Sequence, residues 1–250
     1  MENRSKNKKL ALIPVYNEQE KIAEVIAGIR EVDEEIDIVV IDDGSTDRTP
    51  RNARLAGARV ISHTSNMGYG VALQTGYKYA FQDGYEYLVQ LDGDGQHDPI
   101  YIPELLQIVT SGEADLALGS RFLKEISPDS PLLRKYKAGT TRKLGIKIFA
   151  FLTTRLIGLE ITDPTSGYQA FNRRLIAFFT RDIFPCDFPD ADVIVIAHRA
   201  GFKFKEVPMV MYERDKGKSM HSGLKPLYYA FKMFLSIFMA VVREKPFPLY

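Results

Sequence analysis

The sequence predicts an α/β fold in which helices flank a mostly parallel central sheet. Strand and helix patterns alternate through the first half of the 250 residues, an order that is typical of parallel sheets covered by helices. Hydrophobic residues make up 45% of the chain and charged residues 26%, which suits a globular domain with a substantial core. Polar residues directly follow several predicted strands, so we expect a binding site at the carboxyl edge of the sheet.

The elements of the first half follow from apolar runs and from helical spacing. Buried strands are predicted at 10–15, 36–42, 58–63, 85–91 and 114–120. A first helix is predicted from Asn17, as its N-cap, to about residue 30. A second begins at Thr49 as N-cap, with Pro50 in the first helical position. Two more are predicted at 70–81 and from about Pro99 to Gly112.

The regular alternation lapses after Arg121. The segment 132–159 predicts a long, basic, amphipathic helix. Its predicted apolar side consists of Leu144, Ile148, Phe151, Leu152 and Leu156. Its basic residues lie on another side and are Lys143, Lys147 and Arg155. A turn and strand at 165–173, a helix at 191–201 and strand pieces at 202–214 follow.

The tail, residues 221–250, contains a strongly apolar helix at about 224–243. Lys232 lies in the middle of this helix and Pro226 near its start. A spanning helix needs about 20 predominantly apolar residues, so these two favour a helix that lies on a membrane surface.

Basic charge is concentrated in the second half of the chain. Nine basic residues oppose two acidic ones between Arg121 and Arg155, and ten oppose four from Arg199 onward. Such a surface favours anionic partners. Nucleic acid is not expected, because the basic segments alternate with aliphatic faces rather than with exposed stacking aromatics. The single cysteine, Cys186, and the absence of a signal-peptide pattern predict a cytoplasmic protein.

Three polar clusters follow predicted strands and are expected to share one edge of the sheet. They are Asn17 and Glu18, Asp42 and Asp43, and Asp92 and Asp94. In the last cluster Gly93 separates two aspartates that can direct oxygen atoms to one divalent cation, and Mg²⁺ and Mn²⁺ prefer such ligands. Gln96 can add an amide oxygen. On its own this spacing is more often a plain acidic, glycine-rich turn between a strand and a helix than a metal site.

Other cation and phosphate motifs do not fit. An EF-hand loop that began at Asp92 would need Gly where His97 stands and Glu where Pro103 stands. The chain has no GxxxxGK[ST] loop, and the segment 68–73 lacks the third glycine of a dinucleotide fingerprint.

Seven segments, taken in order, resemble the motif series of the family 2 inverting glycosyltransferases, which have the GT-A (nucleotide-diphospho-sugar transferase) fold. They are PVYNE (14–18), IDDGSTD (41–47), NMGYG (66–70), LDGDGQHDP (91–99), GSR (119–121), DPTSGYQAFNR (163–173) and ERDKGKS (213–219). Within that family the series resembles the dolichyl-phosphate mannose synthase and polyprenyl-phosphate glycosyltransferase branch. The similarity implies a catalytic domain at 1–220, with a nucleotide-sugar half at about 8–121 and an acceptor half at about 122–220.

The resemblance also implies roles for residues at matching positions. It assigns donor binding to Pro14, Tyr16, Glu18, Asp42, Asp43, Gly68, Asp92, Gln96, Arg214, Lys218 and Ser219, with Asp42 or Asp43 on the base. Asp92, Asp94 and Gln96 would hold Mg²⁺ or Mn²⁺. Arg121 would face the sugar and Arg134, Ser166 and Gly167 the acceptor. The chain departs from the family at Tyr69, where many relatives have Lys, and at Gln169, where mannose synthases often have Arg.

The implied reaction moves mannose or glucose from a GDP-mannose or UDP-glucose type of donor to a polyprenyl or dolichyl phosphate at the cytoplasmic membrane face, with an integral membrane protein as a further partner. A lipid phosphate is already ionised near pH 7 and needs no general base. A hydroxyl acceptor does need one, and Asp190 or Asp192 would supply it, unless they only cap the following helix. A hydroxyl acceptor, a nucleotidyltransferase and a non-catalytic membrane scaffold are the alternatives.

Overall fold

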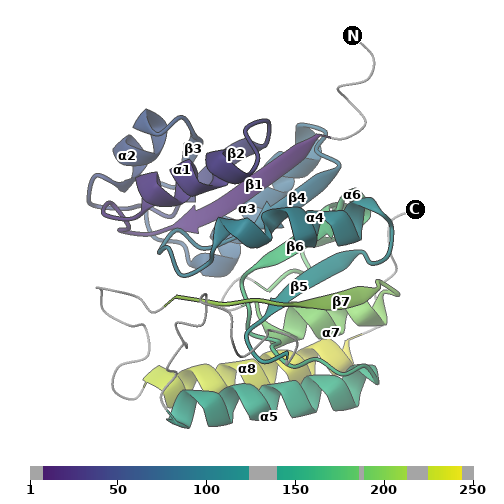
Figure 1. Ribbon diagram of the computed structural model, residues 1–250. Helices are drawn as coiled ribbons and strands as arrows, with labels where there is room; N and C mark the ends of the chain where they lie inside the picture. Colours follow the sequence, from purple (N-terminus) through teal and green to yellow (C-terminus); the bar gives the residue numbers. More distant parts are fainter. Residues whose placement is uncertain (1–7, 124–139, 186–188, 213–224, 244–250) are drawn as a thin grey trace.

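A seven-stranded sheet forms the centre of the computed structural model, which describes residues 8–123, 140–185, 189–212 and 225–243 (Figure 1). Its strands are β1 (Lys9–Val15), β2 (Asp37–Asp42), β3 (Arg59–Ser62), β4 (Tyr87–Gln90), β5 (Leu116–Ser120), β6 (Gln169–Asn172) and β7 (Phe204–Pro208). The strand order is β3-β2-β1-β4-β6-β5-β7. Only β6 runs antiparallel to its neighbours among these strands, so the predicted mostly parallel sheet is confirmed.

The strand order reverses between β1 and β4, and this reversal positions the site. The chain builds β2 and β3 on one side of β1 and then returns to place β4 on the other side. Ligands of such sheets bind beyond the carboxyl ends of the strands at the point of reversal. Because β6 is antiparallel, the loop that precedes Gln169 reaches the same edge as the ends of β4 and β5.

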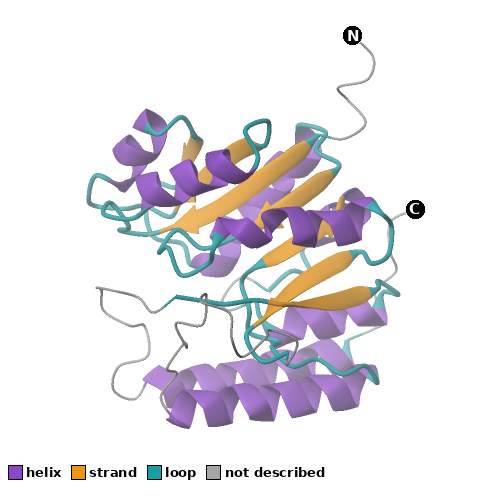
Figure 2. Cartoon of the chain, in the orientation of Figure 1, coloured by secondary structure: helices purple, strands orange, loops and turns teal. Residues whose placement is uncertain are grey.

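Helices cover both faces of the sheet (Figure 2). Helices α1 (Ile22–Val32), α2 (Thr49–Leu55) and α4 (Ile102–Thr110), which follows the short 3₁₀ helix η1 (Pro99–Tyr101), pack on one face. Helices α3 (Tyr69–Gln82), α6 (Arg173–Phe179) and α7 (Ala191–Arg199) pack on the other. Within β1, Leu10 and Leu12 enter one core while Ala11 and Ile13 enter the other, as the two-residue repeat of a strand requires.

Helices α5 (Thr140–Ile157) and α8 (Lys225–Val242) lie side by side on the outer surface of α7 (Figure 1). Phe149, Ala191, Met233 and Ile237 form a small core between these three helices. The side of α5 that was predicted to be apolar is only partly buried, since Leu152 packs against this core whereas Ile148, Phe151 and Leu156 face solvent.

Helix α8 exposes a longer apolar row. The row recurs at helical spacing and consists of Phe231, Phe234, Leu235, Phe238, Met239 and Val242. We refer to this row, together with Ile148, Phe151 and Leu156 of α5, as the exposed apolar rows. No helix in the described part of the chain is both long enough and apolar enough to cross a bilayer.

Two predicted helix caps are wrong. Asn17 does not cap α1, because its backbone is left-handed (φ 56°) and its Oδ1 accepts a hydrogen bond from Thr46 N at 2.9 Å. Thr49 is already the first residue of α2. Its Oγ1 accepts a hydrogen bond from Glu18 N at 2.8 Å, so both side chains connect the loops after β1 and β2.

Helix α6 was not predicted. It begins directly after β6, where Asn172 caps it by accepting a hydrogen bond from Leu175 N at 3.0 Å.

Candidate active site

The predicted site residues in the described ranges gather at the carboxyl edge of the sheet. They lie at or directly after the ends of β1, β2, β4 and β5, between β3 and α3, in the loop before β6 and at the start of α7. Arg134, Arg214, Lys218 and Ser219 fall outside the described residues, so their assignments stay predictions.

The loop that carries Asp92 and Asp94 needs glycine for two reasons. A Cβ at Gly93 would lie 2.4 Å from Val15 Cγ1, so no larger residue fits under the loop. Gly95 has a φ of 77°, a backbone conformation that favours glycine. The turn is completed by Gln96 N, which donates a hydrogen bond to Asp94 Oδ1 at 3.0 Å. The Asp92 side chain stays 34% exposed and can meet a ligand.

The chain that follows β7 holds Gln96 in an orientation in which its amide oxygen can serve as a metal ligand. Its Nε2 donates to Tyr212 O at 3.0 Å, while Tyr212 N donates to Gln96 O at 2.9 Å. Because the amide nitrogen is held this way, the amide oxygen of Gln96 remains for a cation. The described residues contain no group of three or more His, Cys, Asp or Glu side chains that would hold a metal ion. Two carboxylates and one amide oxygen nevertheless fit a hard cation that completes its shell with water and substrate phosphates.

His97 supports this loop as a neutral side chain. Its Nδ1 accepts a hydrogen bond from Asp92 N at 3.0 Å, and its ring stacks on Tyr168 with 4.9 Å between the ring centroids. Burial lowers the pKa of His97 to about 4, although the charge of Asp94 opposes this shift. His97 is therefore uncharged at neutral pH and shapes the backbone at Asp92.

Asp42 and Asp43 are both buried and bonded inside the protein. Asp43 accepts hydrogen bonds from Met67 N and Gly68 N, each at 2.9 Å, and its Oδ1 lies 2.8 Å from His63 Nδ1. Asp42 Oδ1 accepts a hydrogen bond from Ser45 N at 3.0 Å. These contacts hold the N-terminal end of α3 against β2, and the role of either residue in base binding stays a prediction.

The first predicted motif also separates into buried and accessible residues. Pro14 is buried within β1, paired with Ile41 in the neighbouring strand. Tyr16 is 45% exposed beyond the end of that strand. Glu18 is tied through its backbone to Thr49, as described above, so the motif forms one rim of the carboxyl edge.

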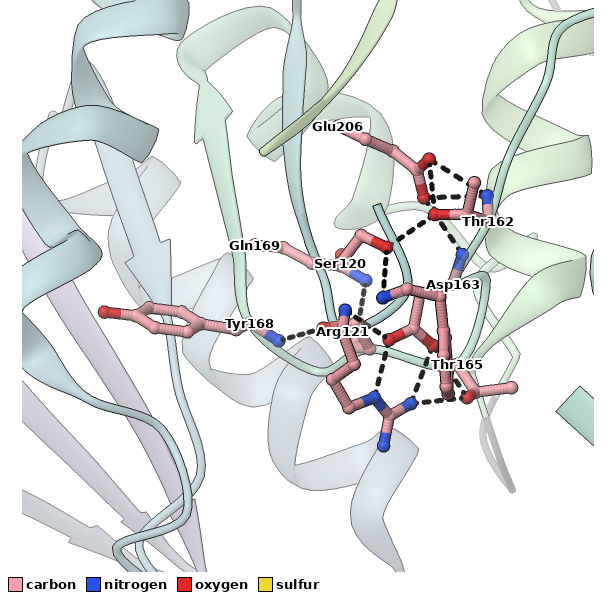
Figure 3. A network of polar contacts seen from close by, with 10 residues as sticks. Ser120, Arg121, Thr162, Asp163, Thr165, Tyr168, Gln169 and Glu206 are labelled. Atoms are coloured by element: carbon pink, nitrogen blue, oxygen red, sulfur yellow. Dashed lines mark hydrogen bonds and ion pairs between the residues drawn. The ribbon is translucent and has the colours of Figure 1, made fainter. Parts of the chain in front are cut away.

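Arg121 pairs with an acidic residue inside the protein (Figure 3). Its Nε and Nη2 donate to the two carboxylate oxygens of Asp163 at 2.6 and 2.7 Å, and Nη2 also donates to Thr165 Oγ1 at 2.9 Å. The Arg121 side chain is 5% exposed and that of Asp163 is fully buried. Arg121 therefore anchors the loop before β6, and a contact with the sugar stays a prediction.

Glu206 of β7 holds the same loop from the other side (Figure 3). Its carboxylate accepts hydrogen bonds from the backbone N–H groups of Thr162 and Asp163, each at about 3.0 Å. Burial raises the pKa of Glu206, although these hydrogen bonds oppose the shift. Sequence reasoning gave no role to Asp163 or Glu206. Asp163 opens a recognised motif, whereas nothing in the strand pattern around Glu206 marks it.

The anchored loop carries Ser166 and Gly167. Ser166 is buried, and its Oγ accepts a hydrogen bond from Tyr168 N at 3.3 Å. Gly167 lies against the acidic loop, since a Cβ there would be 3.3 Å from Asp92 Oδ2. Of these two predicted acceptor residues, Gly167 is the one that the structure brings to Asp92.

Asp190 and Asp192 have different environments at the start of α7. Asp192 is fully buried and accepts hydrogen bonds from Asp190 N and Val193 N, each at 2.9 Å, and from the Ser236 hydroxyl of α8. Burial raises its pKa despite these contacts. Asp190 occupies the N-cap position, but its side chain makes no capping hydrogen bond. Asp192 is thus bonded inside the protein, and a role of Asp190 as a base stays a prediction.

Comparison with known proteins identifies a family. Residues 11–179 match Glycosyl transferase family 2. The undecaprenyl-phosphate mannosyltransferase of Micrococcus luteus is 31% identical, over 86% of this chain and 87% of the relative. The polyprenol monophosphomannose synthase of Mycolicibacterium smegmatis is 33% identical, over 86% and 81%. The dolichyl-phosphate hexose transferase of Haloferax volcanii is 32% identical, over 80% of each chain.

Solved structures share the fold. Glucosyl-3-phosphoglycerate synthase from Mycobacterium tuberculosis, crystallised with Mn²⁺, uridine-diphosphate-glucose and phosphoglyceric acid, superposes with a TM-score of 0.70. The match covers 96% of this chain and 82% of that one at 19% sequence identity. At this identity the match shows the fold alone, which confirms the predicted GT-A architecture.

Proposed function

The chain belongs to glycosyl transferase family 2 and is a glycosyltransferase, and from this premise we propose that it moves a hexose from a nucleotide-diphosphate sugar to a polyprenyl or dolichyl phosphate. The observation that carries the proposal is the acidic loop at the point of strand reversal, where Asp92, Asp94 and Gln96 present oxygen ligands. The names of three relatives, each about 30% identical, support the lipid phosphate as acceptor. A GDP-mannose or UDP-glucose type of donor is part of the proposal.

The transfer is a single displacement with inversion. An oxygen of the acceptor phosphate forms a bond to the anomeric carbon of the hexose. The bond from that carbon to the donor diphosphate breaks on the opposite face, and a nucleoside diphosphate leaves. Since the second pKa of a phosphate monoester is about 6, no side chain has to remove a proton from the acceptor near pH 7.

The residues of the chain hold the reactants for this step. Asp92, Asp94 and Gln96 would bind Mg²⁺ or Mn²⁺, which when bound supplies the positive charge that stabilises the leaving diphosphate. Asp43 fixes the start of α3, and Arg121 fixes the loop before β6 through Asp163. The two anchors therefore hold α3 and the loop before β6, which both border the acidic loop through Tyr69 and Gly167.

We also propose that the enzyme works on the cytoplasmic face of a membrane, resting on it through α5 and α8. The exposed apolar rows have the spacing of helices that bury one side at the boundary between headgroups and acyl chains. Lys147 and Arg155 on α5 are exposed next to these rows and would meet anionic headgroups.

Incubation of the purified protein with extracted polyprenyl phosphate and a panel of radiolabelled nucleotide sugars tests the proposal. We expect label from one donor to become soluble in organic solvent when Mg²⁺ or Mn²⁺ is present. Label that enters only water-soluble products would identify a hydroxyl acceptor instead. Full transfer by a variant with Ala at both Asp92 and Asp94 would contradict the proposed role of the acidic loop.

A further inference from the structure

Tyr69 makes a direct contact with the acidic loop. It is the first residue of α3, and its hydroxyl donates a hydrogen bond to Asp92 Oδ1 at 3.0 Å. The names of the relatives do not point to a tyrosine at position 69, and the proposed transfer reaction does not need one there. The contact links a helix to one oxygen of a proposed metal ligand.

The position of Tyr69 is fixed by its own chain. Gly68 precedes it with a φ of 104°, so the chain turns sharply into the helix. Asp43 accepts hydrogen bonds from the N–H groups of Met67 and Gly68, which ties this turn to the end of β2. These contacts therefore hold the backbone at Tyr69 in place.

The loop before β6 closes over the pair. A Cβ at Gly167 would lie 3.0 Å from Tyr69 Oη and 3.3 Å from Asp92 Oδ2. Gly167 O accepts a hydrogen bond from Gln90 Nε2 at 3.1 Å, and Tyr77 of α3 donates in turn to Gln90 Oε1. This backbone is too close for either side chain to change position freely.

The direction of this hydrogen bond follows from the two groups. An ionised carboxylate offers only acceptor oxygens, so the phenol of Tyr69 is the donor and Asp92 Oδ1 the acceptor.

We propose that Tyr69 is the positioning residue for Asp92. By holding Oδ1, it fixes the rotamer in which the partly exposed carboxylate faces the cation that would bind the donor diphosphate. The inference rests on the proposed function, since it concerns the same metal site. It assigns to α3 a part in metal affinity rather than in sugar or lipid recognition.

Tyr69→Phe removes the hydroxyl and keeps the ring, and it should weaken Mn²⁺ binding in the presence of UDP or GDP about 10- to 150-fold, the range expected when a hydrogen bond to a charged group is lost. Calorimetric titration of Mn²⁺ without acceptor measures this affinity independently of transfer. Tyr85→Phe is the matched control. Tyr85 is buried too and donates to Asp37 Oδ2 at 3.0 Å, but Asp37 begins β2 at the opposite edge of the sheet. It should lower the melting temperature and leave Mn²⁺ affinity unchanged.

Unchanged Mn²⁺ affinity in folded Tyr69→Phe would overturn the inference, and so would an equal loss in Tyr85→Phe. If Tyr69→Phe does not fold, Gly167→Ala disturbs the pair from the other side and should weaken Mn²⁺ binding in the same direction; wild-type affinity there would also overturn the inference. A wild-type protein that transfers sugar without binding Mn²⁺ or Mg²⁺ would instead refute the metal dependence of the proposed function.

Discussion

Single carboxylates at the carboxyl edge differ in what neutralises their charge. The side chains of Asp43 and Asp163 are 6% and 0% exposed, and their oxygens accept hydrogen bonds from the protein itself. The Asp92 side chain is 34% exposed. Buried carboxylates of the first kind must be paired to be tolerated, whereas one at an open edge can take a cation from solution. The cation of the proposed function is therefore assigned to the loop of Asp92 and Asp94.

Replacing Asp94 tests that assignment. Asp94→Asn keeps the shape and the hydrogen bond from Gln96 N but removes the negative charge, so we expect kcat to fall about 100-fold or more. Initial rates with radiolabelled donor and circular dichroism of the variant give the measurement. Asp33→Asn makes the same change at the end of α1, beside Lys9, and should leave kcat unchanged. Equal activity in both variants would exclude Asp94 as a metal ligand.

Asp190 separates the two classes of acceptor. A phosphate acceptor brings no proton to remove, so Asp190→Asn should lower kcat with polyprenyl phosphate less than about 10-fold, whereas loss of a required general base costs about 10²–10⁴-fold. The pH profile of kcat/KM supplies a second measurement, because a required base would add an acidic limb that the variant lacks. A loss above 100-fold with polyprenyl phosphate in a variant that still folds would contradict transfer to this acceptor without a general base.

At the scale of elements, the start of α7 depends on α8. The Ser236 hydroxyl of α8 donates to Asp192, and Asp192 in turn accepts from the backbone of Asp190. Ala191 is buried between them in the core that α8 shares with α5. The helices that carry the exposed apolar rows thus help to place the turn that holds Asp190.

Asp192 makes this junction sensitive to pH. Burial raises its pKa above the ordinary 3.8, so its folded-state pKa exceeds that of the unfolded chain. Its contribution to stability is then complete below the unfolded pKa and is lost as the pH rises through the folded pKa. Asp192→Asn stays neutral, so the stability of wild type relative to this variant should fall as the pH rises from about 4 toward 7. Urea unfolding at several pH values measures it. If the stability difference between wild type and Asp192→Asn stayed constant or rose with pH, the pKa of Asp192 would not be raised in the folded protein.

The elements show why sequence reasoning succeeded in some places. β1, β2 and β4 are apolar runs closed by polar residues, and a strand end is a local feature, so their positions and that of the acidic loop were predictable. The antiparallel direction of β6 was not predictable, because a strand of four residues does not specify which strand it pairs with or in which direction. Asp43 was marked as polar, but its partners Met67 and Gly68 lie 24 and 25 residues later. Long-range pairing decides its role.

At the scale of the whole molecule, the two ends of the structure have different surfaces. The first half contributes the carboxyl edge with its acidic loop, and the second half contributes α5 and α8 with exposed apolar residues (Figure 1). Periodicity predicted two amphipathic helices. It did not predict that Ile148, Phe151 and Leu156 of α5 would face outward, because Phe149 is the α5 residue buried in the core with α7 and α8.

Membrane contact through α8 is the last prediction. Phe231 and Phe238 are 66% and 60% exposed, and burying a phenylalanine side chain is worth about 1.5–3 kcal/mol. Replacing both with Gln should therefore weaken binding to vesicles of phosphatidylcholine and phosphatidylglycerol about 10- to 100-fold or more, as flotation measures. Transfer to a short-chain, water-soluble phosphate acceptor should persist, because neither side chain touches the acidic loop.

Leu55→Gln serves as the control for this double substitution. Leu55 is 76% exposed on α2, away from α5 and α8, so its loss should leave vesicle binding unchanged. The alternative is that a second copy of the chain covers the exposed apolar rows. Analytical sedimentation without lipid tests this by measuring the oligomeric state. The membrane assignment fails if the wild type sediments as a dimer that the double substitution dissociates, and if neither the wild type nor the double variant binds vesicles. The exposed apolar rows would then form a protein interface. Binding that falls for Phe231 and Phe238 but not for Leu55 would instead tie the lipid surface to the helix that, through Ser236, also supports the turn at Asp190.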